Sequence, residues 1–295
     1  MIKVFVRACF LLFTSVAMAM GDRLPETGTT RLFDDPERVT VQGYDGDEME
    51  PFITRDGRYL LFNNSNDPSV NTNLHWAERI DDLTFAYKGE IESVNTSALE
   101  GVASMDRHHT LYFVSTRSYE KSLSTIYRAT FSNGHVSNVE IVPGISRLEP
   151  GMVNFDAEIS ADGSTLYFVD GRFAGGGVPE TADIVIAERE GNGFHRRADS
   201  GQIMQNVNSA VLEYAPCISS DGLTLFFTRL RNGLGASPAI YMAQRSNATE
   251  PFGSPLKLVA IEGFVEAPTL SADEKSLYYH RRESGKFVLY RVTRK

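Results

Sequence analysis

The stretch from Ser160 to Phe168 reads SADGSTLYF, and variants of it recur along the chain. Five copies align without gaps, and each ends in an aromatic residue. Successive closing aromatics are separated by 51, 55, 59 and 52 residues, a period that marks the blades of a β-propeller. Five copies therefore predict five blades. The copies are Thr54–Phe62 (TRDGRYLLF), Met105–Phe113 (MDRHHTLYF), Ser160–Phe168, Ser219–Phe227 (SSDGLTLFF) and Ser271–Tyr279 (SADEKSLYY).

Each copy has the same local context. A polar turn, usually Asp-Gly, separates a short leading run from an apolar-aromatic run, which predicts a β-hairpin. A third strand follows a variable loop, as at 184–189 (IVIAER) and 240–245 (IYMAQR). Weaker fourth strands are expected near 85–91, 136–142, 194–197 and 255–259. The predicted fold class is all-β, a single five-bladed β-propeller of four-stranded blades that forms one domain over residues 38–295.

The last blade needs a strand from elsewhere, because the chain ends at Lys295 just after its third strand. An uncovered sheet edge is prone to pair with other chains. The alternating run Arg38–Gln42 (RVTVQ) has no blade of its own, so we expect this N-terminal strand to complete the last blade and close the ring. Residues 20–37, rich in Gly, Pro and charge, are expected to form a leader or a strap over the surface.

Two further features accompany the repeat: third strands with the pattern I-[YV]-x-A-x-R, and the pairs Asn95-Thr96 and Asn208-Ser209 before inner strands. With these features, the sequence resembles the WD40-like propeller repeats of the TolB type over residues 38–295. Blades two and five depart from the pattern at their turns, with Asp106-Arg107-His108-His109 and Asp273-Glu274. TolB proteins carry another domain before a six-bladed propeller, and the sequence shows neither. The resemblance therefore implies a propeller-only relative and transfers no activity.

The first nineteen residues are typical of a bacterial secretory signal peptide. Lys3 and Arg7 precede an apolar run that is too short to span a bilayer, and Ala17-Met18-Ala19 offers small residues for cleavage near Ala19. The mature chain is expected to be periplasmic or secreted and to lack a transmembrane segment. Cys9 leaves with the signal peptide, so Cys217 remains alone and no intramolecular disulfide is possible.

The net charge of the protein limits the kinds of partner that it is expected to bind. The 295 residues carry a formal net charge of -9, with an isoelectric point near 5.2, so the protein repels phosphate backbones and nucleic acid is not an expected partner. We expect a monomer without a cofactor. Each Asp-Gly turn supplies one carboxylate, whereas calcium takes six or more oxygen ligands. A cation such as calcium at the channel mouth stays an open alternative.

In a propeller, the loops that enter the inner strands share one face with the loops that join second and third strands. Acidic residues recur in these entering segments and are expected to ring the channel mouth, where they are flanked by arginines four residues after a closing aromatic. The residues selected as ligand-binding are Glu50, Asp156, Glu158, Glu213, Glu266, Arg117, Arg172 and Arg231; Glu48, Glu100 and Glu262 belong to the same acidic set.

Two interpretations of these acids stay open. Each acid can pair with an arginine or accept hydrogen bonds from backbone amides, and so hold the blades together. The ring can instead bind a polar ligand, a cation or a basic segment of a partner. The favoured hypothesis is an exported, non-enzymatic binding or scaffolding module for a protein or glycan of the cell envelope.

The alternative is a glycoside hydrolase that acts on polysaccharide through two inner-strand carboxylates. Close carboxylates raise one another's pKa and can supply a general acid and a base. Against this hypothesis, the mature chain offers only Trp76 among tryptophans to stack on a sugar ring, and no catalytic residue can be assigned. A purely structural protein is the third possibility.

Three other sequence features are interpreted without a functional role. They are a surface turn at residues 108–109, a buried thiol at Cys217 and a flexible connector at residues 175–177.

Overall fold

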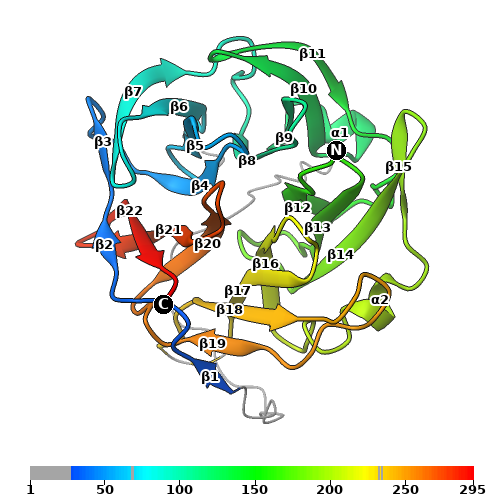
Figure 1. The fold of residues 1–295 in the computed structure, drawn as a ribbon. Coiled ribbons are helices and arrows are strands. Elements are labelled where there is room, and N and C mark those ends of the chain that lie inside the picture. The colour runs from blue at the N-terminus through cyan, green and yellow to red at the C-terminus, as the bar shows by residue number, and fades with distance from the viewer. Residues whose placement is uncertain (1–27, 68–69, 232, 234) are drawn as a thin grey trace.

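A computed structural model describes residues 28–67, 70–231, 233 and 235–295. The chain is all-β, with 51% of its residues in strands and 3% in helices. Groups of strands surround a common centre, and β4, β8, β12, β16 and β20 lie nearest to it (Figure 1). The two short helices, α1 (Tyr119–Ser122) and α2 (Ser200–Ile203), lie in connections between strands.

The strands pair in antiparallel units that follow one another along the chain. The first holds β4 (Met49–Ile53), β5 (Tyr59–Asn63), β6 (Leu74–Arg79) and β7 (Thr84–Glu90), and the second β8 (Glu100–Met105), β9 (Thr110–Ser115), β10 (Ile126–Ser132) and β11 (His135–Ile141). The third holds β12 (Met152–Ile159), β13 (Thr165–Arg172), β14 (Thr181–Glu190) and β15 (Gly193–Arg196), and the fourth β16 (Leu212–Ile218), β17 (Thr224–Leu230), β18 (Ala239–Gln244) and β19 (Leu256–Leu258). The fifth holds β20 (Val265–Leu270), β21 (Ser276–Glu283) and β22 (Lys286–Thr293).

Strands β7, β11, β15 and β19 lie where the sequence predicted fourth strands. A parallel bridge between Ala182 of β14 and Leu212 of β16 joins the third and fourth units into one nine-stranded sheet. The described residues therefore form four hydrogen-bonded sheets.

The N-terminal segment crosses three units instead of one. Strand β1 (Thr29–Thr30) pairs in parallel with β19, β2 (Glu37–Arg38) pairs antiparallel with β22, and β3 (Thr40–Gln42) pairs in parallel with β7. The run 38–42 was predicted as one strand of the last blade, but only Arg38 and the N–H of Val39 bond to β22 of that unit. The chain changes partners at this point, because Val39 N–H donates to Leu289 O while Thr40 N–H donates to Leu83 O.

Within the predicted leader or strap, strands β1 and β2 pair with the fourth and fifth units, whereas residues 20–27 and the predicted signal peptide lie outside the described residues. Phe33 anchors this segment. It is buried, and its ring centroid lies 6.0 Å from that of Phe226.

Contacts within the turns and between neighbouring units explain why the same residues recur in the repeat. In the SADG turn, Asp162 Oδ1 accepts from Ser160 Oγ and from the backbone N–H of Ser164. Arg189 of the A-x-R pattern donates to Gly163 O, at 2.7 Å, and to Tyr112 OH of the preceding unit, also at 2.7 Å. Arg245 makes the same two contacts, with Gly222 O and with Tyr167 OH. The motif Tyr and Arg therefore tie each of these units to its neighbour.

Side chains alternate between the two faces of each unit. In β5, Leu60 and Phe62 pack in a cluster with Leu289 of the fifth unit, whereas Leu61 packs in a cluster with Phe113 of the second. Both faces are covered, so the strands are continuous apolar runs in the sequence.

Candidate functional site

Each inner strand carries a β-bulge at the same point of its length. The register shifts in β4, β8, β12, β16 and β20, and one residue in each shift has a positive φ between 49° and 56°. Such backbone is uncommon outside glycine, and a bulge re-aims the side chains around it. The five bulge residues line one central cavity; they are Glu50, Val102, Asp156, Ala215 and Ala267.

The central cavity is small. Its volume is about 30 Å³, counted as the space that the centre of a water molecule can occupy. This is room for about two waters. Glu50, Asp156 and Glu158 are its acidic lining residues, and most of the remaining lining is proline and alanine.

Glu50 and Asp156 lie buried at this cavity. Glu50 Oε1 accepts from Asn66 Nδ2 at 2.8 Å, and Asp156 Oδ2 accepts from the backbone N–H of Ala215 at 2.9 Å. Burial raises the pKa of Glu50 to about 8, with a further rise from the charges of Asp156 and Glu266. Burial likewise raises the pKa of Asp156 to about 7. Within the described chain, no arginine or lysine forms an ion pair with either carboxylate.

A chain of hydrogen bonds connects Glu50 to Tyr214. The backbone N–H of Glu50 donates to His280 Nδ1 at 3.1 Å, so the ring proton of His280 lies on Nε2 and faces Glu266 Oε2, also at 3.1 Å. Glu266 Oε1 accepts from Tyr214 OH. Burial, together with the charge of Glu266, raises the pKa of Tyr214 well above its usual value, so this hydroxyl stays a donor.

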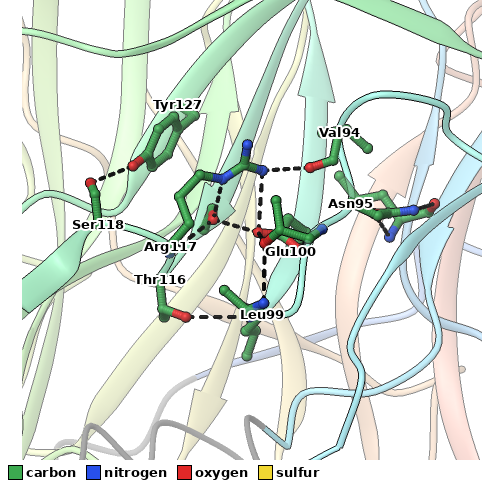
Figure 2. Close-up of polar contacts among 12 residues, drawn as sticks. Val94, Asn95, Leu99, Glu100, Thr116, Arg117, Ser118 and Tyr127 are labelled. Carbon is green, nitrogen blue, oxygen red and sulfur yellow. Dashed lines mark hydrogen bonds and ion pairs between the residues drawn. The ribbon is translucent and has the colours of Figure 1, made fainter.

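Glu100 has a different environment at the start of β8 (Figure 2). Its carboxylate accepts from Thr96 N–H and Oγ1, from Ser115 Oγ and from Arg117 Nη2, the last at 3.2 Å. Arg117 also donates to Val94 O. The acid and the arginine therefore satisfy each other and the loop that enters the second unit.

Glu213 repeats this arrangement in the fourth unit. It accepts from Ser209 N–H at 2.9 Å and from Ser209 Oγ at 2.6 Å, and Arg229 Nε donates to it at 2.7 Å. Burial raises the pKa of Glu213, although Ser209 and Arg229 oppose the shift. Asn208, the residue before Ser209, accepts from the N–H of Ile184 in the third unit and donates to the C=O of the same residue. Glu100 and Glu213 therefore follow the first interpretation in part: each pairs with an arginine and accepts a backbone amide of the loop that enters its own unit.

Glu158 also lines the cavity. Arg55 Nη2 donates to Glu158 Oε1 at 2.9 Å and to Ile159 O at 2.7 Å, while Arg55 Nε donates to Met105 O at 3.2 Å. Arg55 comes from the first unit and reaches the second and third. Ser104 Oγ also donates to Glu158, at 2.6 Å. These bonds tie three inner strands together.

The remaining predicted residues lie apart from the cavity. Arg172 is exposed and lies 3.5 Å from Glu149, and Arg231 and Glu262 are also exposed. Glu48 is buried and accepts from Leu289 N–H at 3.2 Å; burial raises its pKa to about 7. The acids thus occupy different depths of the inner strands and do not form one exposed ring. Most of them are buried, and their carboxylates accept hydrogen bonds inside the fold.

Several residues that bond to these acids were missed by the sequence reasoning. They include Asn66, Tyr214, His280 and Arg55, together with Arg229, which lies two residues after its closing aromatic and not four. One signal was available: the residue after the closing aromatic is polar in three copies, Asn63, Thr228 and His280, and each accepts a bulge N–H of the next unit. Within the described ranges, no group of three His, Cys, Asp or Glu side chains is arranged to hold a metal ion.

Solved structures with the same arrangement identify the architecture. A family 117 glycoside hydrolase from Zobellia galactanivorans matches with a TM-score of 0.56 at 10% identity, covering 89% of this chain and 91% of that one. An α-L-arabinofuranosidase from Podospora anserina matches with a TM-score of 0.54 at 11% identity, covering 92% and 99%. The fold is a β-propeller. Identities this low show the fold alone.

TolB structures also match the propeller. A putative TolB from Agrobacterium tumefaciens has a TM-score of 0.50 at 13% identity, covering 88% of this chain and 78% of that one. The chain spans 54% of the length of a TolB from Acinetobacter baumannii. No family model and no curated protein matches the sequence, so the WD40-like repeat family stays a resemblance. None of the helices in the described ranges has the length and apolar character needed to cross a bilayer.

Proposed function

We propose that this protein is an exported, five-bladed β-propeller that binds a protein or glycan of the cell envelope without catalysing a reaction. The count of five rests on the five antiparallel units, and closure on the pairing of β2 with β22 at the last unit. Export rests on the signal-like N-terminus, and it places the mature protein in the periplasm or the medium.

The size of the central cavity carries this proposal. Room for about two waters is too little for a sugar ring, and three of the acids predicted to form a binding rim, Glu100, Glu158 and Glu213, are paired with arginines inside the fold. A propeller with a filled centre can still bind through its loops, which vary without disturbing the core.

Of the four large apolar side chains that are exposed in the described residues, three lie in loops on one face of the propeller. Val70, Leu148 and Val178 lie in loops that enter an inner strand or join second and third strands, and Leu148 and Val178 are 63% and 46% exposed. These loops share one face of a propeller, whereas Ile80, 56% exposed, lies in the β6–β7 turn at the opposite face. Single exposed apolar side chains are ordinary on a protein surface, so these residues serve as probes of the two faces.

Crosslinking capture from an envelope extract tests this function. The protein, a Leu148→Asp/Val178→Asp variant and an Ile80→Asp control are compared by mass spectrometry. We expect a partner that the protein and the Ile80→Asp control retain and the loop variant loses. Equal capture by all three proteins contradicts a binding role for this face. If no protein is captured, the same three proteins are applied to a glycan array.

A glycoside hydrolase is the second candidate, because Glu50 and Asp156 share one cavity and burial raises both pKa values to near neutrality. Two carboxyl groups about 5–5.5 Å apart suit retaining hydrolysis, and about 6.5–9.5 Å apart suit inverting hydrolysis. The test is a panel of aryl glycosides, including an α-L-arabinofuranoside, together with polysaccharides. Hydrolysis that Glu50→Gln and Asp156→Asn abolish in folded protein supports this candidate, and its absence from the whole panel contradicts it.

A further inference from the structure

Leu148, in the loop between β11 and β12, combines two unfavourable features. Its side chain is 63% exposed, and its backbone is left-handed, with a φ of 56°. A bulky residue seldom adopts this conformation, because its Cβ comes too close to the neighbouring backbone. Ile80 and Val178 are also exposed but do not have this backbone. Strained backbone of this kind concentrates at functional sites, and little burial of the leucine offsets it here.

The loop that carries Leu148, residues 145–151, is fixed to the fold at both ends. Arg196 Nη1 donates to the carbonyl oxygen of its first residue at 2.6 Å, and Tyr119 OH accepts from the N–H of its last residue at 3.1 Å. Between them, the N–H of Leu148 donates to Ser146 Oγ at 3.1 Å. The leucine is therefore held outward by a preordered loop, which reduces the conformational entropy that a contact would otherwise lose.

Two half-exposed arginines flank the leucine. Arg147 precedes it in the chain and is 50% exposed, while its Nε donates to the buried Asp170 at 3.0 Å. Arg172 is 51% exposed and lies 3.5 Å from Glu149, the residue that follows the leucine. Arginine is enriched in protein–protein interfaces, where its planar group binds carboxylates through two hydrogen bonds.

The β13–β14 loop extends this surface. The N–H of Phe173 donates to Gly151 O at 2.8 Å, which joins this loop to residues 145–151. The same loop carries Val178, which is 46% exposed. The Leu148 patch is the set Arg147, Leu148, Arg172 and Val178. None of the four is aromatic, so the patch offers no ring on which a sugar can stack.

We propose that Leu148 is an apolar anchor that enters a pocket on a partner protein, and that carboxylates at the rim of this pocket pair with Arg147 and Arg172. This inference rests on the proposed function and narrows its ligand from a protein or glycan to a protein. The chain as a whole has a net charge of -9, whereas two arginines and one exposed acid, Glu149, surround the leucine. An acidic partner surface is therefore repelled by most of the protein and oriented toward this patch.

Photocrosslinking in cells that export the full chain tests the anchor. Benzoylphenylalanine replaces Val178 within the patch in one protein and Ile80 at the opposite face in another. We expect a cross-linked partner from position 178 and not from position 80. Mass spectrometry then identifies the cross-linked peptide of the partner, which should contain apolar residues beside aspartate or glutamate.

Variants of the position-178 protein separate the anchor from its loop. Asparagine tolerates left-handed backbone, so Leu148→Asn should not lower the urea midpoint of unfolding. Cross-linking should nevertheless fall by about tenfold or more, the factor expected when a buried leucine contact is lost. Arg172→Glu should also reduce cross-linking. Arg31→Glu is its matched control, because Arg31 is 54% exposed and pairs with Asp35 outside the patch, and it should leave cross-linking unchanged.

Several outcomes would refute the anchor. A lower unfolding midpoint in Leu148→Asn would give the leucine a structural role, and cross-linking that both Leu148→Asn and Arg172→Glu leave unchanged would show that the patch is not recognised. A cross-link between two copies of this chain, or a partner peptide without carboxylates, also overturns it. A partner cross-linked from position 80 alone refutes the anchor and leaves the binding function standing, whereas no cross-link from either position counts against both.

Discussion

Glu213 and Arg229 form an ion pair with a 2.7 Å separation between Oε1 and Nε, and the two side chains are 0% and 3% exposed. Arg229 also donates to Val207 O, and its guanidinium lies 5.0 Å from the centre of the Tyr241 ring. A residue predicted to bind a ligand is thus a structural acid, with its charge and its hydrogen bonds satisfied inside the fold.

Arg229→Ala should destabilise the protein by about 3–5 kcal/mol, because it leaves the buried Glu213 charge without its partner. The measurement is urea unfolding followed by circular dichroism. Arg172→Ala is the control, since the Arg172–Glu149 pair is exposed and its loss should change stability by less than about 0.5 kcal/mol. Equal effects of the two substitutions would contradict the structural role.

The contact between Tyr167 and Arg245 should appear as a coupling energy across two units. In a double-mutant cycle with Tyr167→Phe and Arg245→Ala, we expect a coupling of about 1 kcal/mol, the worth of a partly buried hydrogen bond. Tyr167→Phe combined with Arg31→Ala, at an exposed pair with Asp35, should be additive. A cycle without coupling would mean that the repeated Tyr and Arg do not tie neighbouring units together.

Global stability should fall as pH rises through neutrality. The folded-state pKa of Glu50 is raised from 4.5 to about 8, and that of Asp156 from 3.8 to about 7, so the folded state holds protons that the unfolded state has lost. The stability linked to these groups is complete below pH 3.8–4.5 and is lost as pH rises to about 8. Glu50→Gln should reduce this slope in unfolding curves, and the exposed Glu149→Gln should not. A slope unaffected by Glu50→Gln would count against a protonated Glu50.

Phe33→Ala should cost about 3–5 kcal/mol, as expected for a fully buried aromatic. Phe33 packs against Phe226, so its removal should also release the segment that crosses the fourth, fifth and first units. Limited proteolysis should then cleave within residues 28–42 before the rest of the chain. Val178→Ala, at an exposed loop, is the control and should leave both readouts unchanged. Resistance of this segment in Phe33→Ala would show that strand pairing alone retains it.

Cys217 should not react with a thiol reagent while the protein is folded. Burial raises the pKa of its thiol, and the side chain lies in an apolar cluster. In a Cys9→Ser background, we expect modification by a chromogenic disulfide only above the unfolding transition in urea. Rapid labelling of the folded protein would indicate that the inner strand β16 opens.

Much of the architecture could be predicted from local pattern. The copies of the nine-residue repeat located the hairpins, and the weaker runs that follow the third strands located the fourth strands, because both follow from turn chemistry and from strand patterns within a few residues. The path of the N-terminal segment could not be predicted, since its strands are only two or three residues long and pair with units far away in the sequence.

The roles of the acids were the least predictable part. Glu50, Asp156 and Glu213 look alike in the sequence, yet one faces Asn66 and His280, one accepts an amide of the next unit, and one pairs with Arg229. These differences arise from residues 16 to 230 positions away, which local sequence does not bring together.

The sequence by itself determined a repeated hairpin unit, its number of copies and its acidic inner strands, because these depend on short-range periodicity. Only the tertiary structure decided which carboxylates are neutralised by arginine and which lie in the central cavity without an arginine or lysine partner. The physical reason is that the protonation and partners of a buried acid depend on the side chains and backbone amides of the units packed against it.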